Sequence, residues 1–242
     1  MRFELAKLTG MRRGLLMACA LGAASAPAFA DPRGSSRVVA EHGNIVLISG
    51  SVRKVLTGTG RDSAPSLTPD GQWVMFTRSA KPQPDPTDDA LTDCASLSGS
   101  DELRQVKTDG SGDVLLLQGR TGSEPSQALC GFHNKQFSSD GRTIYFLSPA
   151  WATSSGLHLY SRDSQTARFV MPANDFVVLS WCTSTLKDAI IAQQHRYFKF
   201  GGSFDWYWLF DASGKTEQGP VGEFDSVDAI KNDLDASGQC QS

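Results

Sequence analysis

A cluster of carboxylates is the first candidate for chemistry in this sequence. Asp85, Asp88 and Asp89 lie in a proline-rich stretch, and Asp93 follows them. Ca²⁺ takes several carboxylate oxygens as ligands, so a calcium site is one interpretation and a solvated surface loop is the other. The ligand spacing of an EF-hand is missing. We therefore expect no obligatory cofactor, with Ca²⁺ as the one candidate, and name Asp85, Asp88 and Asp89 as candidate binding residues.

Signatures of enzymes are missing from the rest of the sequence. There is no metalloprotease H-E-x-x-H motif, phosphate-binding loop or dinucleotide fingerprint. The string at 201–205 comes nearest to a nucleophile elbow but lacks its closing small residue. No two cysteines have the C-x-x-C spacing of a zinc site, and His42, His133, His158 and His195 are scattered. The sequence thus favours binding over catalysis and leaves an enzyme as the alternative.

An aromatic cluster near the C-terminus is the second candidate site. Eight aromatic residues fall between positions 197 and 210: Tyr197, Phe198, Phe200, Phe204, Trp206, Tyr207, Trp208 and Phe210. Strand alternation places Trp206 and Trp208 on one face. A strand that is apolar on both faces is typical of packing between two sheets, and a binding surface for a peptide or glycan is the alternative. We name Trp206 and Trp208 as candidate binding residues.

The first 30 residues have the pattern of a secretory signal peptide. Arg12-Arg13 precede an apolar run of about a dozen residues, and Ala28-Phe29-Ala30 form an A-x-A cleavage site. The run is shorter than the roughly 20 apolar residues of a membrane span, so we expect Sec-type export, cleavage after Ala30 and no membrane span. Translation could also start at Met11. Twin-arginine export and lipidation of Cys19 are the alternatives, and each places the mature protein in the periplasm or outside the cell.

Four cysteines remain after the leader, an even number that suits an oxidising compartment. Three pairings are open. We favour Cys94–Cys130, which would hold a long polar insertion, and Cys182–Cys240, which would hold the C-terminal tail. Free buried thiols are the alternative.

The mature chain reads as short strands separated by turn residues, without a helical pattern of ten or more residues. The predicted strands cover 45–48, 53–56, 73–77, 103–108, 114–118, 143–147, 157–160, 168–171, 176–181, 189–192, 197–200 and 206–210. We expect a flexible lead-in over 31–43, an all-β domain over 44–230 with a polar insertion at 79–100, and a tail over 231–242.

A repeat indicates which all-β architecture this is. Leu67–Phe76 and Phe137–Phe146 match position by position, with Asp70-Gly71 and Asp140-Gly141 as their structural turns. Asp can bond the amides of its own turn, and Gly accepts a positive φ. The turns lie 70 residues apart, or 48 without the insertion of 22 residues, close to the roughly 40–50 residues of a propeller blade. A degraded third copy starts at Trp181.

These motifs resemble the TolB-type, WD-repeat-like β-propeller family, whose blades carry an apolar–Ser–Pro–Asp–Gly turn before a strand. The resemblance covers 44–220 and implies a propeller of about four four-stranded blades, with five as an alternative. The ring could also be incomplete. Val221–Ile230 could then supply strands that the first blade lacks, or two copies could complete each other as a homodimer. From its length we expect this chain to lack the α/β domain of TolB.

Charge and fold together favour a protein-binding function. The formal net charge is −3, and removing residues 1–30, which hold four positive and one negative side chains, makes it −6. Such a chain is a poor candidate for binding nucleic acid. The resemblance implies a binding or scaffold module for periplasmic or envelope proteins, with the insertion and one mouth of the propeller as contact surfaces. A propeller-type lyase or hydrolase acting on glycans or peptides is the alternative.

Overall fold

The structure is a computed structural model, and it describes residues 36–80, 94 and 101–241. These residues belong to one compact unit, Arg33–Ser242. The predicted signal peptide and Asp85, Asp88, Asp89 and Asp93 lie outside the described residues. Of the predicted insertion, only Ser79, Ala80 and Cys94 are described.

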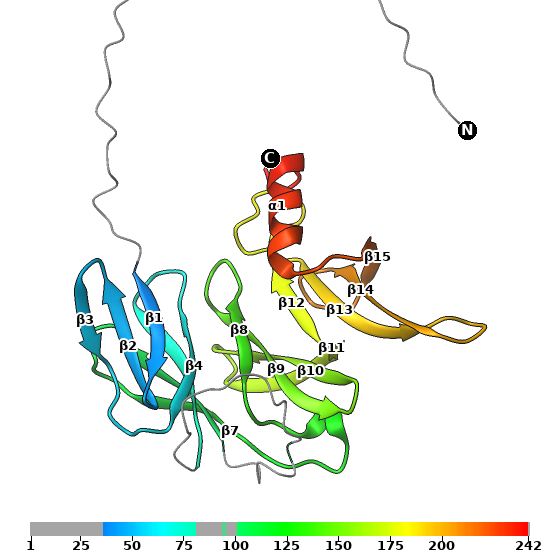
Figure 1. Cartoon of the computed structure of the whole chain (residues 1–242). Helices are drawn as coiled ribbons and strands as arrows, with labels where there is room; N and C mark the ends of the chain where they lie inside the picture. The colour runs from blue at the N-terminus through cyan, green and yellow to red at the C-terminus, as the bar shows by residue number, and fades with distance from the viewer. Residues whose placement is uncertain (1–35, 81–93, 95–100, 242) are drawn as a thin grey trace, which may run out of the picture. The chain divides into compact units, whose positions relative to one another are not determined.

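Four antiparallel sheets contain the strands of the described chain, and each sheet uses strands that are consecutive in the sequence (Figure 1). The first sheet is β1 (Arg37–Glu41), β2 (Asn44–Ser49) and β3 (Val52–Val55), and the second is β4 (Asp62–Leu67), β5 (Trp73–Arg78), β6 (Glu102–Lys107) and β7 (Val114–Gln118). The third is β8 (His133–Phe137), β9 (Thr143–Trp151), β10 (Ser154–Ser161) and β11 (Thr166–Ala173), and the fourth is β12 (Asp175–Val178), β13 (Ile190–Tyr197), β14 (Ser203–Phe210) and β15 (Glu217–Gly222). Sheets of this order are propeller blades. The predicted all-β propeller fold is confirmed, with three four-stranded blades and a three-stranded first blade.

Separate apolar cores join successive blades. The core between the first two blades includes Ile45, Leu56, Val74, Phe76 and Val106. The next two cores are formed by Met75, Leu103, Phe137, Ile144 and Phe146, and by Leu147, Leu157, Phe176, Ile190 and Phe210. The first strands of the blades, β1, β4, β8 and β12, are neighbours in that order (Figure 1); we call them the inner strands. Alternate residues of β5 and of β9 thus contact the blades on either side.

The two repeated turns are built in the same way. The hydroxyl of Thr68 donates to the Asp70 carboxylate at 2.6 Å, and the amide of Gln72 donates to the same oxygen at 3.0 Å. In the second copy, the hydroxyl of Ser138 donates to Asp140 at 2.6 Å. These hydrogen bonds lower the pKa values of Asp70 and Asp140 below the ordinary value of an aspartate. The glycine after each aspartate has a positive φ, 66° at Gly71 and 69° at Gly141.

Three inner strands were not predicted from the sequence. β1 occupies residues 37–41, where we expected a flexible lead-in over 31–43. β4 and β8 are polar, and both change register, in β4 between Ser63 and Ser66. Ala64 and Asn134 lie in these irregular segments with φ values of 46° and 45°. A bulged, polar strand lacks the regular alternation by which strands are recognised.

The C-terminal segment differs from the prediction. Val221–Ile230 was expected to add strands to the first blade, but its start belongs to β15 of the fourth blade and its end to helix α1 (Val227–Ser237). The hydroxyl of Ser226 accepts from the amide of Ala229 at the helix start, and Gly238, with φ 67°, ends the helix. α1 buries Ile230 and Leu234 against the face of the fourth blade that is turned away from the third. Among the described residues, no helix is long and apolar enough to cross a membrane.

Both disulfides follow the pairing that the sequence favoured. Cys94 is bonded to Cys130, and Cys182 is bonded to Cys240. The second bond attaches the residues after α1 to the turn before β13. Disulfides of this kind indicate an oxidising compartment.

Candidate binding surface

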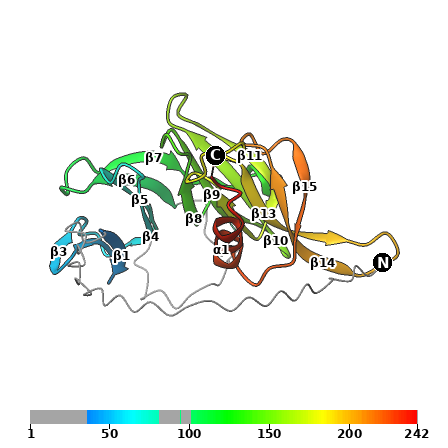
Figure 2. The ribbon, with the colours of Figure 1, turned by 90° about the horizontal axis from the view of Figure 1, so that it is seen from above.

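The β13–β14 hairpin carries the most exposed aromatic residues of the described chain. The two strands pair from Ile190 opposite Phe210 to Tyr197 opposite Ser203. The amide of Phe198 donates to the carbonyl of Gly202 at 3.1 Å and closes the loop. Figures 1 and 2 both show the end of this hairpin extending away from the other strands. The predicted strand at 197–200 is therefore the end of β13 and the hairpin loop.

Three aromatic side chains at this end are open to solvent. Phe200 is 96% exposed, Tyr197 72% and Phe198 53%. Gly201 and Gly202 follow with φ values of 100° and 84°, which side chains with a Cβ rarely adopt. The loop therefore turns tightly and holds the aromatic rings outside the protein core. We call Tyr197, Phe198 and Phe200 the aromatic tip.

A row of rings connects the aromatic tip to the blade. The ring centroids of Phe198 and Phe204 lie 4.5 Å apart, and those of Phe204 and Trp206 lie 5.0 Å apart. These separations are those of interacting aromatic pairs. Trp206, one of the two predicted binding residues, is half-buried within this row.

Trp208, the other predicted binding residue, belongs to the blade rather than to the tip. The Arg196 guanidinium lies 3.6 Å from its ring centroid, and the ring packs against the core between the third and fourth blades. Arg196 also donates to Glu217 at 2.6 Å. Trp208 thus has little free surface for a ligand. The sequence placed the aromatic tip within its aromatic cluster, but it could not show which of those rings are exposed.

Polar contacts brace the hairpin close to the aromatic tip. Nδ1 of His195 and Oδ1 of Asp205 lie 2.8 Å apart across the two strands. The ring of His195 contacts Tyr197 edge-on at 5.0 Å. Arg196 donates two hydrogen bonds along β13 to Gln194, one of them 2.9 Å long, on either side of His195 in the sequence. The aromatic tip is therefore held on a braced hairpin rather than on a free loop.

An open groove of about 640 Å³ lies along the inner strands and is a second candidate surface. Its lining includes Leu67, Asn134, Gln136, Trp181 and Lys231. Trp181 is 39% exposed, and the Lys231 ammonium lies 6.0 Å from its ring centroid. The groove thus combines one accessible ring with amide groups at one end of the inner strands.

Lys135 lines this groove but is almost fully buried. Its Nζ donates to the carbonyl oxygens of Ala64, at 2.8 Å, and of Phe132. Burial lowers the pKa of Lys135 from its ordinary 10.5 to about 7. Ala64 lies in the second blade, and Phe132 lies in the connection to the third. The buried amine of Lys135 therefore joins these blades and is not open to a ligand.

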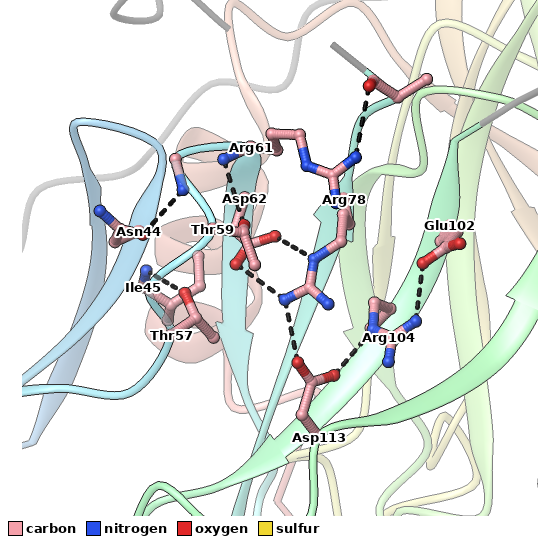
Figure 3. A network of polar contacts seen from close by, with 12 residues as sticks. Asn44, Ile45, Thr57, Thr59, Arg61, Asp62, Arg78, Glu102, Arg104 and Asp113 are labelled. Carbon is pink, nitrogen blue, oxygen red and sulfur yellow. Dashed lines mark hydrogen bonds and ion pairs between the residues drawn. The ribbon is translucent and has the colours of Figure 1, made fainter. Parts of the chain in front are cut away.

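A polar network in the second blade looks like a site but is internally satisfied (Figure 3). Arg78 donates to both oxygens of Asp62, at 2.7 and 3.0 Å, and to Asp113 at 2.9 Å. Arg104 donates to Asp113 and Glu102, each at 2.7 Å. The hydrogen bonds to Asp62 raise the pKa of Arg78. Asp62 and Arg78 are buried, and their groups bind one another, so the network stabilises the blade.

The histidines do not form a metal site in the described part of the chain. His158 is buried, and its ring stacks on Phe146 with centroids 5.7 Å apart. Desolvation lowers the pKa of His158 to about 4, which keeps the ring neutral. Within residues 36–80, 94 and 101–241, no group of three or more His, Cys, Asp or Glu side chains could hold a metal ion.

Comparisons with known proteins concern the fold alone. No family model matches the sequence, and no curated protein matches it. The structure is similar to TolB from Acinetobacter baumannii, with 16% identity and a TM-score of 0.45 over 74% of this chain and 37% of that one. It is also similar to the β-propeller domain of the trilobed protease from Pyrococcus furiosus, with 10% identity and a TM-score of 0.44 over 79% of this chain and 53% of that one. A gluconolactonase from Xanthomonas campestris has 18% identity and a TM-score of 0.48 over 77% of this chain and 58% of its own. The chain spans between about a third and three fifths of these proteins.

Proposed function

We infer that this protein is an exported propeller module that binds another protein of the periplasm or cell envelope through its aromatic tip. The observation that carries this proposal is the exposure of Phe200, 96%, together with Tyr197 and Phe198 on one braced hairpin. A contiguous group of exposed apolar side chains on a soluble protein is typical of an interaction site. Aromatic residues supply a large part of the energy at such sites.

The rigidity of the hairpin supports a specific contact. His195 and Asp205 brace its strands, and Phe198 packs on Phe204. A tip that is already ordered loses less conformational entropy on binding than a free loop does. Phe200 could then insert into an apolar pocket of a partner, with Lys199 beside it, whose Nζ lies 5.8 Å from the Phe200 ring centroid.

Export is the second part of the proposal. The leader pattern of residues 1–30 and the two disulfides agree with an oxidising compartment. In that compartment the partner would be another exported or envelope protein. The resemblance of the repeat turns to those of TolB-type propellers also supports a location in the periplasm or cell envelope.

Site-specific photo-crosslinking tests the proposal in the cell that makes the protein. A benzophenone amino acid replaces Phe200 in the full chain, and the same group replaces Leu115 of the second blade, which is 44% exposed, in the control. We expect a discrete protein adduct from position 200 and none of that mass from position 115.

A second variant separates binding from folding. Phe198→Ser in the photo-reactive protein should reduce the adduct at least several-fold, because it removes the ring that supports the tip, while circular dichroism stays unchanged. An adduct of equal yield at both positions, or one unaffected by Phe198→Ser, would contradict the proposal. Sedimentation with lipid vesicles distinguishes a membrane contact, since vesicle binding without a protein adduct would also contradict it.

A further inference from the structure

The first blade has an open edge. It contains three strands, whereas the other three blades have a fourth strand, β7, β11 or β15, at the corresponding outer position. β3 is the outer strand of the first blade and pairs with β2 from Val46 opposite Val55 to Ser49 opposite Val52. Among the described residues, no strand pairs with the other edge of β3. Alternate residues of β3 therefore present backbone N–H and C=O groups away from β2.

The side chains of β3 are accessible along its whole length. All four residues are exposed, and Val52 and Val55 are each 65% exposed. An unpaired strand edge can accept a further strand, and the charges of Arg53 and Lys54 on this short edge limit which strands fit. The position of the missing strand is therefore open for pairing in the described structure.

The C-terminal segment does not fill this position. Val221 lies in β15, and Ile230 is buried in the helix that covers the fourth blade. The Cys182–Cys240 bond holds the end of the chain on that blade. Among the described residues, no segment of this chain therefore supplies a fourth strand to the first blade.

Charge argues against a second copy of this chain as the donor. The sequence of β3 is Val52-Arg53-Lys54-Val55, a basic segment in a protein with a net charge of −3. If two β3 strands paired antiparallel about a two-fold axis, Arg53 of each copy would lie opposite Lys54 of the other. Like charges directly opposite each other destabilise a strand pair. Arg53 also forms an ion pair with Glu41 of β1 in the same blade, and Lys54 and Arg53 together favour a strand with carboxylates opposite them.

We propose that β3 accepts an extended acidic segment of another protein as the fourth strand of the first blade. Main-chain hydrogen bonds would supply affinity, and the side chains opposite β3 would supply specificity, as in other cases of strand addition. The expected segment has two acidic residues flanked by β-branched residues, in the pattern Val-Glu-Glu-Val. This surface is separate from the aromatic tip, which belongs to the fourth blade.

Peptide binding to the full mature chain tests this proposal. The probe is a fluorescent peptide, Thr-Val-Glu-Glu-Val-Thr, and the control is Thr-Val-Lys-Lys-Val-Thr. We expect the acidic peptide to bind about ten-fold more tightly, because two favourable cross-strand pairs replace two unfavourable ones. The double variant Arg53→Glu, Lys54→Glu should reverse this preference.

Two further measurements identify strand pairing. Methylation of the backbone nitrogens along one edge of the peptide should abolish binding, while methylation along the other edge should not, because only one edge contacts β3. The Phe200→Ser variant should bind the peptide like the unaltered protein, so failure of the aromatic tip and failure of β3 are distinguishable. Equal binding of both peptides, no binding up to about 1 mM, or dimerisation through β3 in sedimentation would overturn the proposal.

Discussion

The carboxylate of Asp188 accepts hydrogen bonds from both the amide, at 2.6 Å, and the hydroxyl, at 2.7 Å, of Ser139. Ser139 lies in the repeated turn between β8 and β9, and Asp188 lies in the turn before β13. Asp188 has a φ of 61°, and its side chain reaches from the fourth blade to the turn of the third. One residue thereby connects the turns of two neighbouring blades.

Asp188→Asn should lower the free energy of unfolding by about 1–3 kcal/mol. Asparagine tolerates the positive φ but carries no charge, so two charge-assisted hydrogen bonds become weaker neutral ones without added backbone strain. Urea denaturation at neutral pH measures the effect. The matched control is Asp163→Asn, because the Asp163 side chain is 70% exposed in a surface ion pair, and it should change stability by less than about 0.5 kcal/mol. Equal effects would show that the contact between the turns does not stabilise the blades.

Lys135 should make stability rise with pH above neutrality. Its folded pKa is about 7 and its ordinary value is 10.5. Between these values the unfolded chain binds a proton that the folded chain does not, so the free energy of unfolding increases from pH 7 towards pH 10. The neutral amine keeps two N–H groups, enough for the carbonyls of Ala64 and Phe132.

Lys135→Met tests this expectation. The variant should lose the rise in unfolding free energy between pH 7 and pH 9.5, whatever its stability at pH 7, when urea midpoints are measured at each pH. Lys187→Met, at an exposed lysine in the turn before β13, should keep the rise. A Lys135 variant with the full rise would show that the amine is protonated when folded.

His158 should make stability fall at acid pH. Its pKa is lowered to about 4 from an ordinary 6.5, so between these values only the unfolded chain takes the proton. The free energy of unfolding should therefore decrease as pH falls from 6.5 to 4. His158→Leu should flatten this part of the curve, and His195→Gln should retain it, because His158 is still present. The curve is measured by thermal unfolding at several pH values, and an unchanged slope in His158→Leu would contradict the prediction.

The Cys182–Cys240 bond should stabilise the docking of α1. Replacing both cysteines by alanine should reduce the free energy of unfolding by about 2–5 kcal/mol. Because Ile230 and Leu234 would detach more often, the variant should bind a hydrophobic dye more strongly. Unfolding and dye fluorescence of the variant are compared with those of Cys94→Ala, Cys130→Ala, which leaves α1 attached. Equal dye binding in both variants would show that α1 remains docked without the bond.

Most central and outer strands could be predicted from the sequence because they are rich in β-branched and aromatic residues. The outer strand β15, which contains Gly219 and Pro220, could not. Thr143–Leu147 lies within β9, and Val114–Gln118 matches β7. The turns at Asp70 and Asp140 were recognisable because their hydrogen bonds are local. β4 and β8 could not be recognised, since their polar residues and register shifts leave no alternating pattern.

The helix and the candidate surface show two other limits of prediction from this sequence. Ser226, the pair Ile230 and Leu234, and Gly238 form a helix signal that the sequence contains, but the helix is short. The aromatic cluster was found from composition. Exposure of Phe200 and partial burial of Trp208 depend on where the hairpin ends and where Arg196 lies, and both follow from the register of β13 and β14.

The position of α1 has a consequence for engineering this protein. Repeat proteins gain length by adding units to an exposed apolar face, and terminal units with a polar outer side stop this growth. α1 covers such a face on the fourth blade, so it acts as a terminator of the array. A fifth blade grafted after Gly222 would need α1 and Cys240 moved to its own far side, because Ile230 and Leu234 otherwise compete with it for the same apolar face.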